Sequence, residues 1–198
     1  MYADLSCPFT HVGLRRLTAA RDVRAPGVRV RVRAWPLEWI NGHPLDSDLV
    51  AAEIAGLRAS VAPDLFTGFD AATFPRTTIP ALGLAAAAYR LGDDAGERMS
   101  LRLREALFEE GRDLADEEQL RAIGCELGVE PLAPRAAEAS VRADWERGRA
   151  RNVRGSPHFF VGERDWFCPS MRVRHEGAAF DISLDLRALE EFYATALA

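Results

Sequence analysis

The chain has 198 residues, 48% of them hydrophobic, and a formal net charge of −5. A chain of this length can bury one sizeable core, and its apolar content excludes a disordered class. The acidic balance argues against nucleic acid or an anionic membrane surface as a partner, since both favour a basic patch. No apolar run approaches the roughly 20 residues that a membrane-spanning helix needs.

The first few residues lack the basic region and apolar stretch of a secretory signal. We therefore expect a cytoplasmic protein in a reducing compartment. In that setting three Cys residues at wide spacings argue against a structural disulfide framework.

In chain order, the sequence first predicts a short strand over residues 1–6 and a helix over about 8–21. Residues 28–34 alternate apolar side chains with Arg, and this period of two indicates a half-buried strand at a sheet edge. Proline and Asn-Gly breakers in residues 35–46 lead the chain out of this first unit.

From residue 47 to about 152 the apolar periodicity is helical, and it predicts four to six helices. Residues 159–161 and 165–167 then predict a β-hairpin around Gly162. Residues 185–197 predict a final amphipathic helix.

The run Cys7-Pro8-Phe9-Thr10 opens the first predicted helix. A sulfur atom there lies beside unpaired backbone N–H groups and the positive end of the helix dipole. This placement lowers a thiol pKa and favours the nucleophilic thiolate. The Thr10 hydroxyl can also donate a hydrogen bond to the sulfur of Cys7. The alternative is an unreactive Cys that packs as a small hydrophobe.

A second motif, Ser156-Pro157, lies nearly the length of the chain away and runs directly into an apolar strand. Proline cannot lie inside a hydrogen-bonded ladder, so this strand must begin at Pro157.

Together the two motifs resemble the DsbA-like branch of the thioredoxin superfamily. Residues 4–13 are similar to the opening D-x-x-C-P-[WF]-C-Y-x-G of that family, with Thr10 in place of the second Cys and His11 in place of the aromatic. The resemblance implies an α/β thioredoxin fold with a helical insertion domain. Residues 1–45 and 153–198 would form the thioredoxin-like core, residues 46–152 the insertion, and a cis Ser156–Pro157 bond would face Cys7.

The resemblance also implies a thiol-disulfide oxidoreductase or isomerase with Cys7 as nucleophile and Thr10 as the partner of its thiolate. Because Thr10 cannot resolve a mixed disulfide, release would need an external thiol. The expected partners are a small thiol or a disulfide-bearing protein or peptide. No permanently bound cofactor is expected, and the candidate for a transiently bound one is glutathione or another small thiol. The predicted substrate-binding residues are Pro8, Phe9, His11, Ser156 and Pro157.

Other functions stay open. Kappa-class glutathione transferases and 2-hydroxychromene-2-carboxylate isomerases share the fold, but use Ser in the nucleophile position to activate bound glutathione. A non-catalytic module would instead hold an extended peptide beside Pro157 through backbone hydrogen bonds. Thr10 is also compatible with a relative that has lost its activity.

The remaining candidates are less specific. His11 lies one helical turn after Cys7, where it would act on the thiol as a cation or base, or pack in place of the family's aromatic. Cys125 fits burial in a helix. Cys168 is expected at the level of Pro157, on the order of 10 Å from Cys7, which is too far for a disulfide without backbone movement. No metal-ligand spacing is evident.

Overall fold

The computed structural model describes residues 1–176 and 179–198. Its elements, in chain order, are β1 (Tyr2–Ala3), α1 (Pro8–Arg24), β2 (Arg33–Ala34), α2 (Leu37–Asn41), α3 (Ser47–Ser60), a 3-10 turn η1 (Ala71–Thr73), α4 (Ile79–Leu91), α5 (Asp93–Phe108), α6 (Glu117–Glu126), α7 (Pro134–Ala150), β3 (His158–Val161), β4 (Arg164–Phe167), β5 (Met171–Glu176), β6 (Ala179–Leu184) and α8 (Leu186–Ala196).

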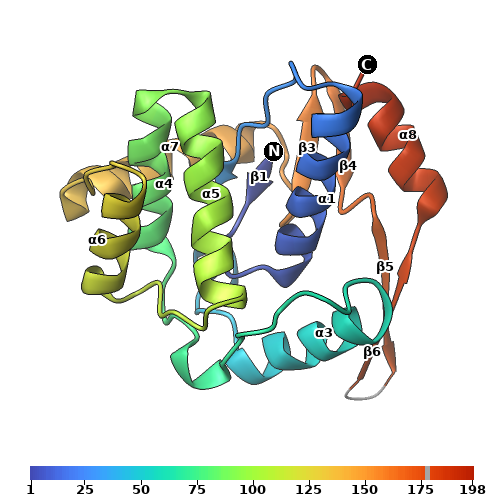
Figure 1. Ribbon diagram of the computed structural model, residues 1–198, viewed down its shortest axis with the longest axis horizontal. Helices are drawn as coiled ribbons and strands as arrows, with labels where there is room; N and C mark the ends of the chain where they lie inside the picture. The colour runs from blue at the N-terminus through green and yellow to red at the C-terminus, as the bar shows by residue number, and fades with distance from the viewer. Residues whose placement is uncertain (177–178) are drawn as a thin grey trace.

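A four-stranded sheet of order β2-β1-β3-β4 forms the centre of the fold (Figure 1). β1 and β2 run parallel, with Tyr2 opposite Arg33, whereas β3 is antiparallel to β1, with Tyr2 opposite His158. β4 returns beside β3 as the predicted hairpin, and β2 lies at the predicted sheet edge. This is the expected thioredoxin order, with a helical segment between its two halves.

Helices cover both faces of this sheet. α1 and α8 pack on one face, where Leu14 and Phe192 join Phe159 of β3 in a separate hydrophobic cluster. α7 approaches the other face so closely that a Cβ at Gly148 would lie 2.6 Å from the Trp35 ring. Glycine at this position therefore permits the contact between α7 and the sheet.

The helical segment between residues 47 and 150 contains five α-helices and η1, within the predicted range. α4 packs against α5, α6 and α7 beside the sheet, while α3 lies apart from them along the β5–β6 hairpin (Figure 1). Most of the buried hydrophobic residues of this segment belong to one continuous cluster that also includes Leu5 and Val12 of the thioredoxin half.

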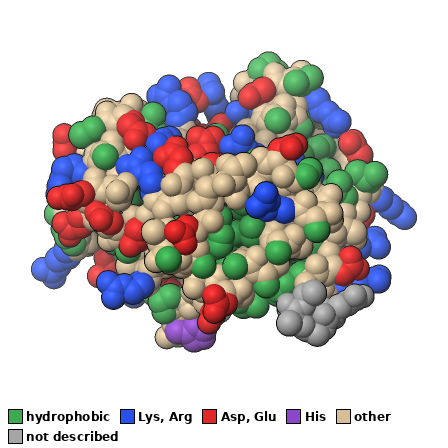
Figure 2. All heavy atoms as spheres, turned by 60° about the horizontal axis from the view of Figure 1, so that its bottom comes forward, with side chains coloured by type: hydrophobic (Ala, Val, Ile, Leu, Met, Phe, Trp, Pro, Cys, Tyr) green, Lys and Arg blue, Asp and Glu red, His purple; other side chains and the backbone are tan. Residues whose placement is uncertain are grey.

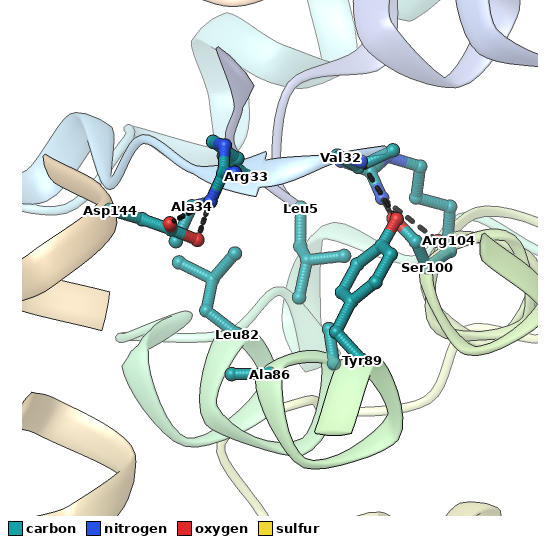
Figure 3. A pocket seen from close by; sticks show the side chains of 11 residues that line it. Leu5, Val32, Arg33, Ala34, Leu82, Ala86, Tyr89, Ser100, Arg104 and Asp144 are labelled. Atoms are coloured by element: carbon teal, nitrogen blue, oxygen red, sulfur yellow. Dashed lines mark hydrogen bonds and ion pairs between the residues drawn. The ribbon is translucent and has the colours of Figure 1, made fainter. Parts of the chain in front are cut away.

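A junction between the sheet and the insertion is shown in Figure 3. The Tyr89 hydroxyl accepts a hydrogen bond from the Val32 N–H at 2.7 Å, and Asp144 accepts one from Arg33 Nη1 at 2.8 Å. The cavity enclosed here measures only about 10 Å³. A space of that size holds at most one water molecule, so this junction is a packing contact and not a ligand site.

Several predicted boundaries were wrong. Only Arg33 and Ala34 of the predicted strand over 28–34 pair in the sheet. On the outer edge of this segment, the N–H groups of Val30, Val32 and Ala34 bond to side chains of the helical segment. α2 and the β5–β6 hairpin were not predicted. Among the described residues, no helix is long and apolar enough to cross a membrane.

Candidate active site

Cys7 occupies the N-cap position of α1, directly before Pro8 at the first helical position. Its carbonyl accepts hydrogen bonds from the N–H groups of Thr10 and His11, at 3.2 and 3.3 Å. Proline suits the first turn because its missing N–H would have no partner there. The helix therefore begins where the sequence predicts, with the side chain of Cys7 at its N-terminal end.

The predicted Ser156–Pro157 motif lies directly against Cys7. The Ser156–Pro157 peptide bond is cis, as expected, and Cys7 Sγ donates a hydrogen bond to the Ser156 carbonyl oxygen at 3.1 Å. The Ser156 hydroxyl accepts from the Asp4 N–H at 2.9 Å and lies 2.8 Å from Thr10 Oγ1. Two motifs from opposite ends of the chain thus form one site.

The thiol of Cys7 is not the activated thiolate that the helix position predicts. Only 4% of Cys7 is exposed, and this burial raises its pKa, against the lowering effect of hydrogen bonds with Thr10 and with the side chain of Ser156. A negative charge on Glu53 raises the pKa further. Burial in a medium of low dielectric disfavours the charged form, and here it outweighs the hydrogen bonds that Thr10 and the Ser156 side chain offer the sulfur. Cys7 is therefore a neutral thiol that donates a hydrogen bond.

His11 does not take part in this site as predicted. Its side chain is 1% exposed and packs against the rings of Phe66 and Phe108, which also contact each other. Burial lowers the pKa of His11, so the ring is neutral at pH 7, and its Nε2 lies 2.7 Å from Glu109 Oε1. His11 therefore joins α1 to the insertion and has no surface with which to contact a substrate.

A pocket of about 440 Å³ opens beside Cys7. Of the predicted substrate-binding residues, Pro8, Phe9 and Ser156 line this pocket. Pro157, directly before β3, is buried and is not part of the lining. The other walls come from elements that the motifs did not indicate, namely the segment around α2, α3, and the β5–β6 hairpin.

Glu53 on α3 is the functional candidate that sequence reasoning missed. It lines the pocket with Cys7, and burial raises its pKa to about 7. A signal for it exists, because Glu53 occupies the i+3 place in the buried stripe of Val50, Ile54 and Leu57. A carboxylate within an otherwise apolar helix face indicates a partly buried charge and therefore a candidate functional residue.

Cys168 lies on the predicted side of the sheet and lines the same pocket as Cys7. Its N–H donates to the Pro157 carbonyl at 3.0 Å, and its φ of 45° lies in the left-handed region, which is uncommon for a residue with a side chain. Burial, and secondly the charge of a Cys7 thiolate, raise the pKa of Cys168 to about 12. Cys125, predicted to be buried, is instead exposed on α6.

The side chains of Asp4 and Arg104 fix the loop that precedes Cys7 through hydrogen bonds. The Asp4 carboxylate accepts from the Ser6 N–H at 2.9 Å and from the Leu37 N–H at 2.6 Å. Arg104 of α5, which is 1% exposed, donates to the Asp4 carbonyl at 3.0 Å. Within residues 1–176 and 179–198, no group of three or more His, Cys, Asp or Glu side chains is placed to hold a metal ion.

The sheet order, the Cys at the start of α1 and the cis-proline loop against it define an α/β protein of the thioredoxin fold with a helical insertion. The family model of the DSBA-like thioredoxin domain matches residues 1–174, and the chain belongs to this family. No curated protein matches the chain.

Solved structures resemble this chain in fold. A 2-hydroxychromene-2-carboxylate isomerase superimposes with a TM-score of 0.65 at 20% identity, over 84% of this chain and 86% of the other. A candidate protein disulfide isomerase from Nitrosomonas europaea gives 0.58 at 14% identity, over 83% and 85%. The cytosolic disulfide reductase DsbM from Pseudomonas aeruginosa, in a structure with GSH, gives 0.48 at 19% identity, over 83% and 86%. At these identities the superpositions of the first two structures show a shared fold.

Proposed function

We propose that this protein is a thiol-disulfide oxidoreductase or isomerase that acts through Cys7 as its single nucleophile. The observation that carries the proposal is the position of Cys7, at the start of α1, against the Ser156 carbonyl and beside an open pocket. Membership of the DSBA-like family, which includes oxidoreductases and isomerases, supports the same class of reaction.

The reaction would proceed in two exchanges. The Cys7 thiol first loses its proton to solvent, and the thiolate attacks one sulfur of a substrate disulfide, so that a mixed disulfide forms and the other substrate sulfur leaves as a thiolate. A second, external thiolate then attacks the mixed disulfide, which restores Cys7 and yields a new disulfide. Thr10 occupies the position from which a second Cys would resolve the intermediate, and its hydroxyl cannot do so.

The contacts at Thr10 suit a supporting role. Thr10 is fully buried, and its hydrogen bonding to the sulfur lowers the pKa of Cys7 against the larger effect of burial. Its hydroxyl also joins α1 to Ser156 at 2.8 Å. We propose that Thr10 stabilises the Cys7 thiolate as it forms and fixes the proline loop at the correct distance.

We place the substrate in the pocket rather than along the backbone of the proline loop. The Ser156 carbonyl accepts from Cys7 Sγ, and the Pro157 carbonyl accepts from the Cys168 N–H. An extended peptide at this edge would compete with contacts that the protein makes within itself. Pro8, Phe9 and Ser156 would contact the substrate, and Pro157 would support Ser156.

The test is turnover of bis(2-hydroxyethyl) disulfide with and without added 2-mercaptoethanol. We expect a single mixed disulfide on Cys7, seen by mass spectrometry, without the thiol, and repeated turnover with it. Cys7→Ser should abolish both results, whereas the matched control Cys125→Ser, on exposed α6, should change neither.

Thr10→Cys should make exchange independent of the external thiol, because a resolving sulfur is then available in the same helix. If Cys7 traps no mixed disulfide and Thr10→Cys stays inert, a glutathione-dependent isomerase or a binding module becomes the better explanation.

A further inference from the structure

The pocket beside Cys7 has an unusual charge content for this chain. All 25 basic residues of the protein are Arg, yet none of the described residues that line the pocket is Arg, Lys or His. Of these described residues, Glu53 is the one with a formally charged side chain. The two thiols in the wall, Cys7 and Cys168, both have raised pKa values, so they are neutral at rest.

The rest of the described lining is mainly aliphatic and aromatic. α3 contributes Leu49 and Val50 to the lining, and β5 contributes Met171 and Val173. β4 adds Phe167. Figure 2 looks on to the face that α3 and the hairpin share, and shows hydrophobic side chains gathered in its middle with most charged side chains around them. A volume of about 440 Å³ lies within the range of pockets that bind small molecules.

Three Arg side chains near the sheet have partners of their own. Arg33 pairs with Asp144, Arg172 pairs with Asp185, and Arg104 is buried below the active-site loop, where it bonds to Ser100 and Asp4. An anionic ligand in the pocket would therefore meet Glu53 without a described cation in the lining. Moving a carboxylate from water into such a site costs free energy that no cationic side chain in the described lining offsets.

From this we infer that the pocket selects thiols or disulfides whose organic group is apolar and either uncharged or cationic, and that Glu53 rejects anionic ones such as glutathione. The inference rests on the proposed function, since it names the substrate class of the same thiol. It also decides between the external thiols considered for release, because glutathione carries two carboxylates and a small neutral or cationic thiol carries none.

Methanethiosulfonate reagents test this directly, because each transfers its R–S group to a thiolate and releases methanesulfinate. The aminoethyl reagent is cationic, the sulfonatoethyl reagent is anionic, and the methyl and benzyl reagents are neutral. Rates at Cys7 and at the exposed Cys125 would be measured together by peptide mass spectrometry at pH 8. The ratio of the two rates removes the intrinsic reactivity of each reagent.

We expect the Cys7/Cys125 ratio to be at least about tenfold higher for the cationic than for the anionic reagent, as one partly buried charge implies. The benzyl ratio should exceed the methyl ratio because the pocket wall is apolar. High salt should reduce the charge preference only in part, since buried charges are screened less than exposed ones.

Two variants isolate the cause. Glu53→Gln should reduce the preference for the cationic reagent to about threefold or less, as expected when the charge is removed. Because the fraction of Cys7 thiolate affects both reagents equally, their quotient is independent of any change in the pKa. Leu49→Arg, at a site that is 47% exposed and so tolerant of substitution, should favour the anionic reagent.

The results with these reagents distinguish failure of the pocket inference from failure of the proposed function. If disulfide exchange is absent but the charge and size preferences hold, the function fails and the pocket inference stands. Equal ratios for the two charged reagents, a preference for the anion, no reaction at Cys7 with any reagent, or an unchanged quotient in Glu53→Gln would each overturn the inference.

Discussion

Cys7 and Ser156, 149 positions apart in the chain, are joined by a hydrogen bond in which the thiol donates to the main-chain oxygen at 3.1 Å. A carbonyl oxygen can accept from a thiol but repels a thiolate. The contact therefore favours the protonated form of Cys7 and adds to the effect of burial, and activation of the sulfur requires this hydrogen bond to break.

The first prediction concerns the pH dependence of Cys7 alkylation. Because burial raises the pKa of Cys7, the rate with iodoacetamide should keep rising beyond the roughly 8.5 of an ordinary thiol. The measurement is peptide mass spectrometry between pH 6 and 11, with exposed Cys125 as internal reference. A rate that levels off near pH 7 would show that the helix terminus dominates after all.

Thr10→Val tests the support that the hydroxyl gives to the sulfur. Loss of one hydrogen bond to a thiolate is worth about 1–2 kcal/mol, so alkylation of Cys7 at pH 8 should slow by about fivefold or more. Thr18→Val is the matched control, since Thr18 lies on the same helix and bonds to the Leu14 carbonyl at 3.0 Å, away from the site. Equal effects of the two variants would indicate a general loss of helix stability.

Glu53→Gln should accelerate alkylation of Cys7 by neutral iodoacetamide at pH 8, in the opposite direction to Thr10→Val. The negative charge of Glu53 raises the pKa of Cys7, so its removal lowers that pKa. Asp48→Asn, an exposed carboxylate in the first turn of the same helix, should leave the rate unchanged. A slower rate in Glu53→Gln would indicate that the carboxylate accepts the thiol proton.

The pair of His11 and Glu109 should make stability fall at acid pH. Burial raises the pKa of Glu109, but hydrogen bonds from His11 and from the N–H groups of Phe66 and Thr67 prevail and hold it at about 2. The folded state thus resists protonation of Glu109. The stability that the Glu109 carboxylate contributes is therefore present above about pH 4.5 and is lost as pH falls towards 2. The pKa of His11 is lowered, so stability begins to fall once pH drops below about 6.5, where the unfolded chain binds the proton first.

Urea unfolding between pH 3 and 8 would measure this dependence. Glu109→Gln should lower the unfolding free energy at pH 7 by about 2 kcal/mol and flatten the acid limb, because hydrogen bonds to a charged group are lost. Glu105→Gln on the same helix breaks a surface ion pair with Arg15 and should cost less than about 1 kcal/mol. Parallel curves for Glu109→Gln and the unmodified protein would refute the assignment.

Local patterns predicted the parts of the structure that depend on neighbouring residues. The starts of α1 and β3 follow from Pro8 and Pro157, whose rings set the backbone and remove an N–H donor. The β3–β4 hairpin follows from the two short strands predicted on either side of Gly162, whose φ of 58° suits a tight turn. The family motif supplied the remaining step, which was the contact between these two ends of the chain.

The wrong predictions concern features that depend on contacts with segments far away in the sequence. The N–H groups of Val30 and Val32 take side-chain partners from the helical segment, which the alternating pattern cannot show. His11 lies on the same helix as Cys7, but Glu109 and two Phe rings determine its direction. The pKa of Cys7 depends on the depth of its burial, and several walls of its pocket come from α3 and the β5–β6 hairpin.

Arg104 makes the geometry of the loop before Cys7 depend on a helix that is synthesised later. Its guanidinium bonds to the Asp4 carbonyl, 100 positions earlier, and to Ser100 on its own helix. The loop before Cys7 therefore cannot reach its final geometry until α5 has docked, although β1 and α1 leave the ribosome first. In native-state hydrogen exchange, the amides of residues 4–7 should open together with α5, so the Cys7 thiol is protected for as long as that helix stays in place.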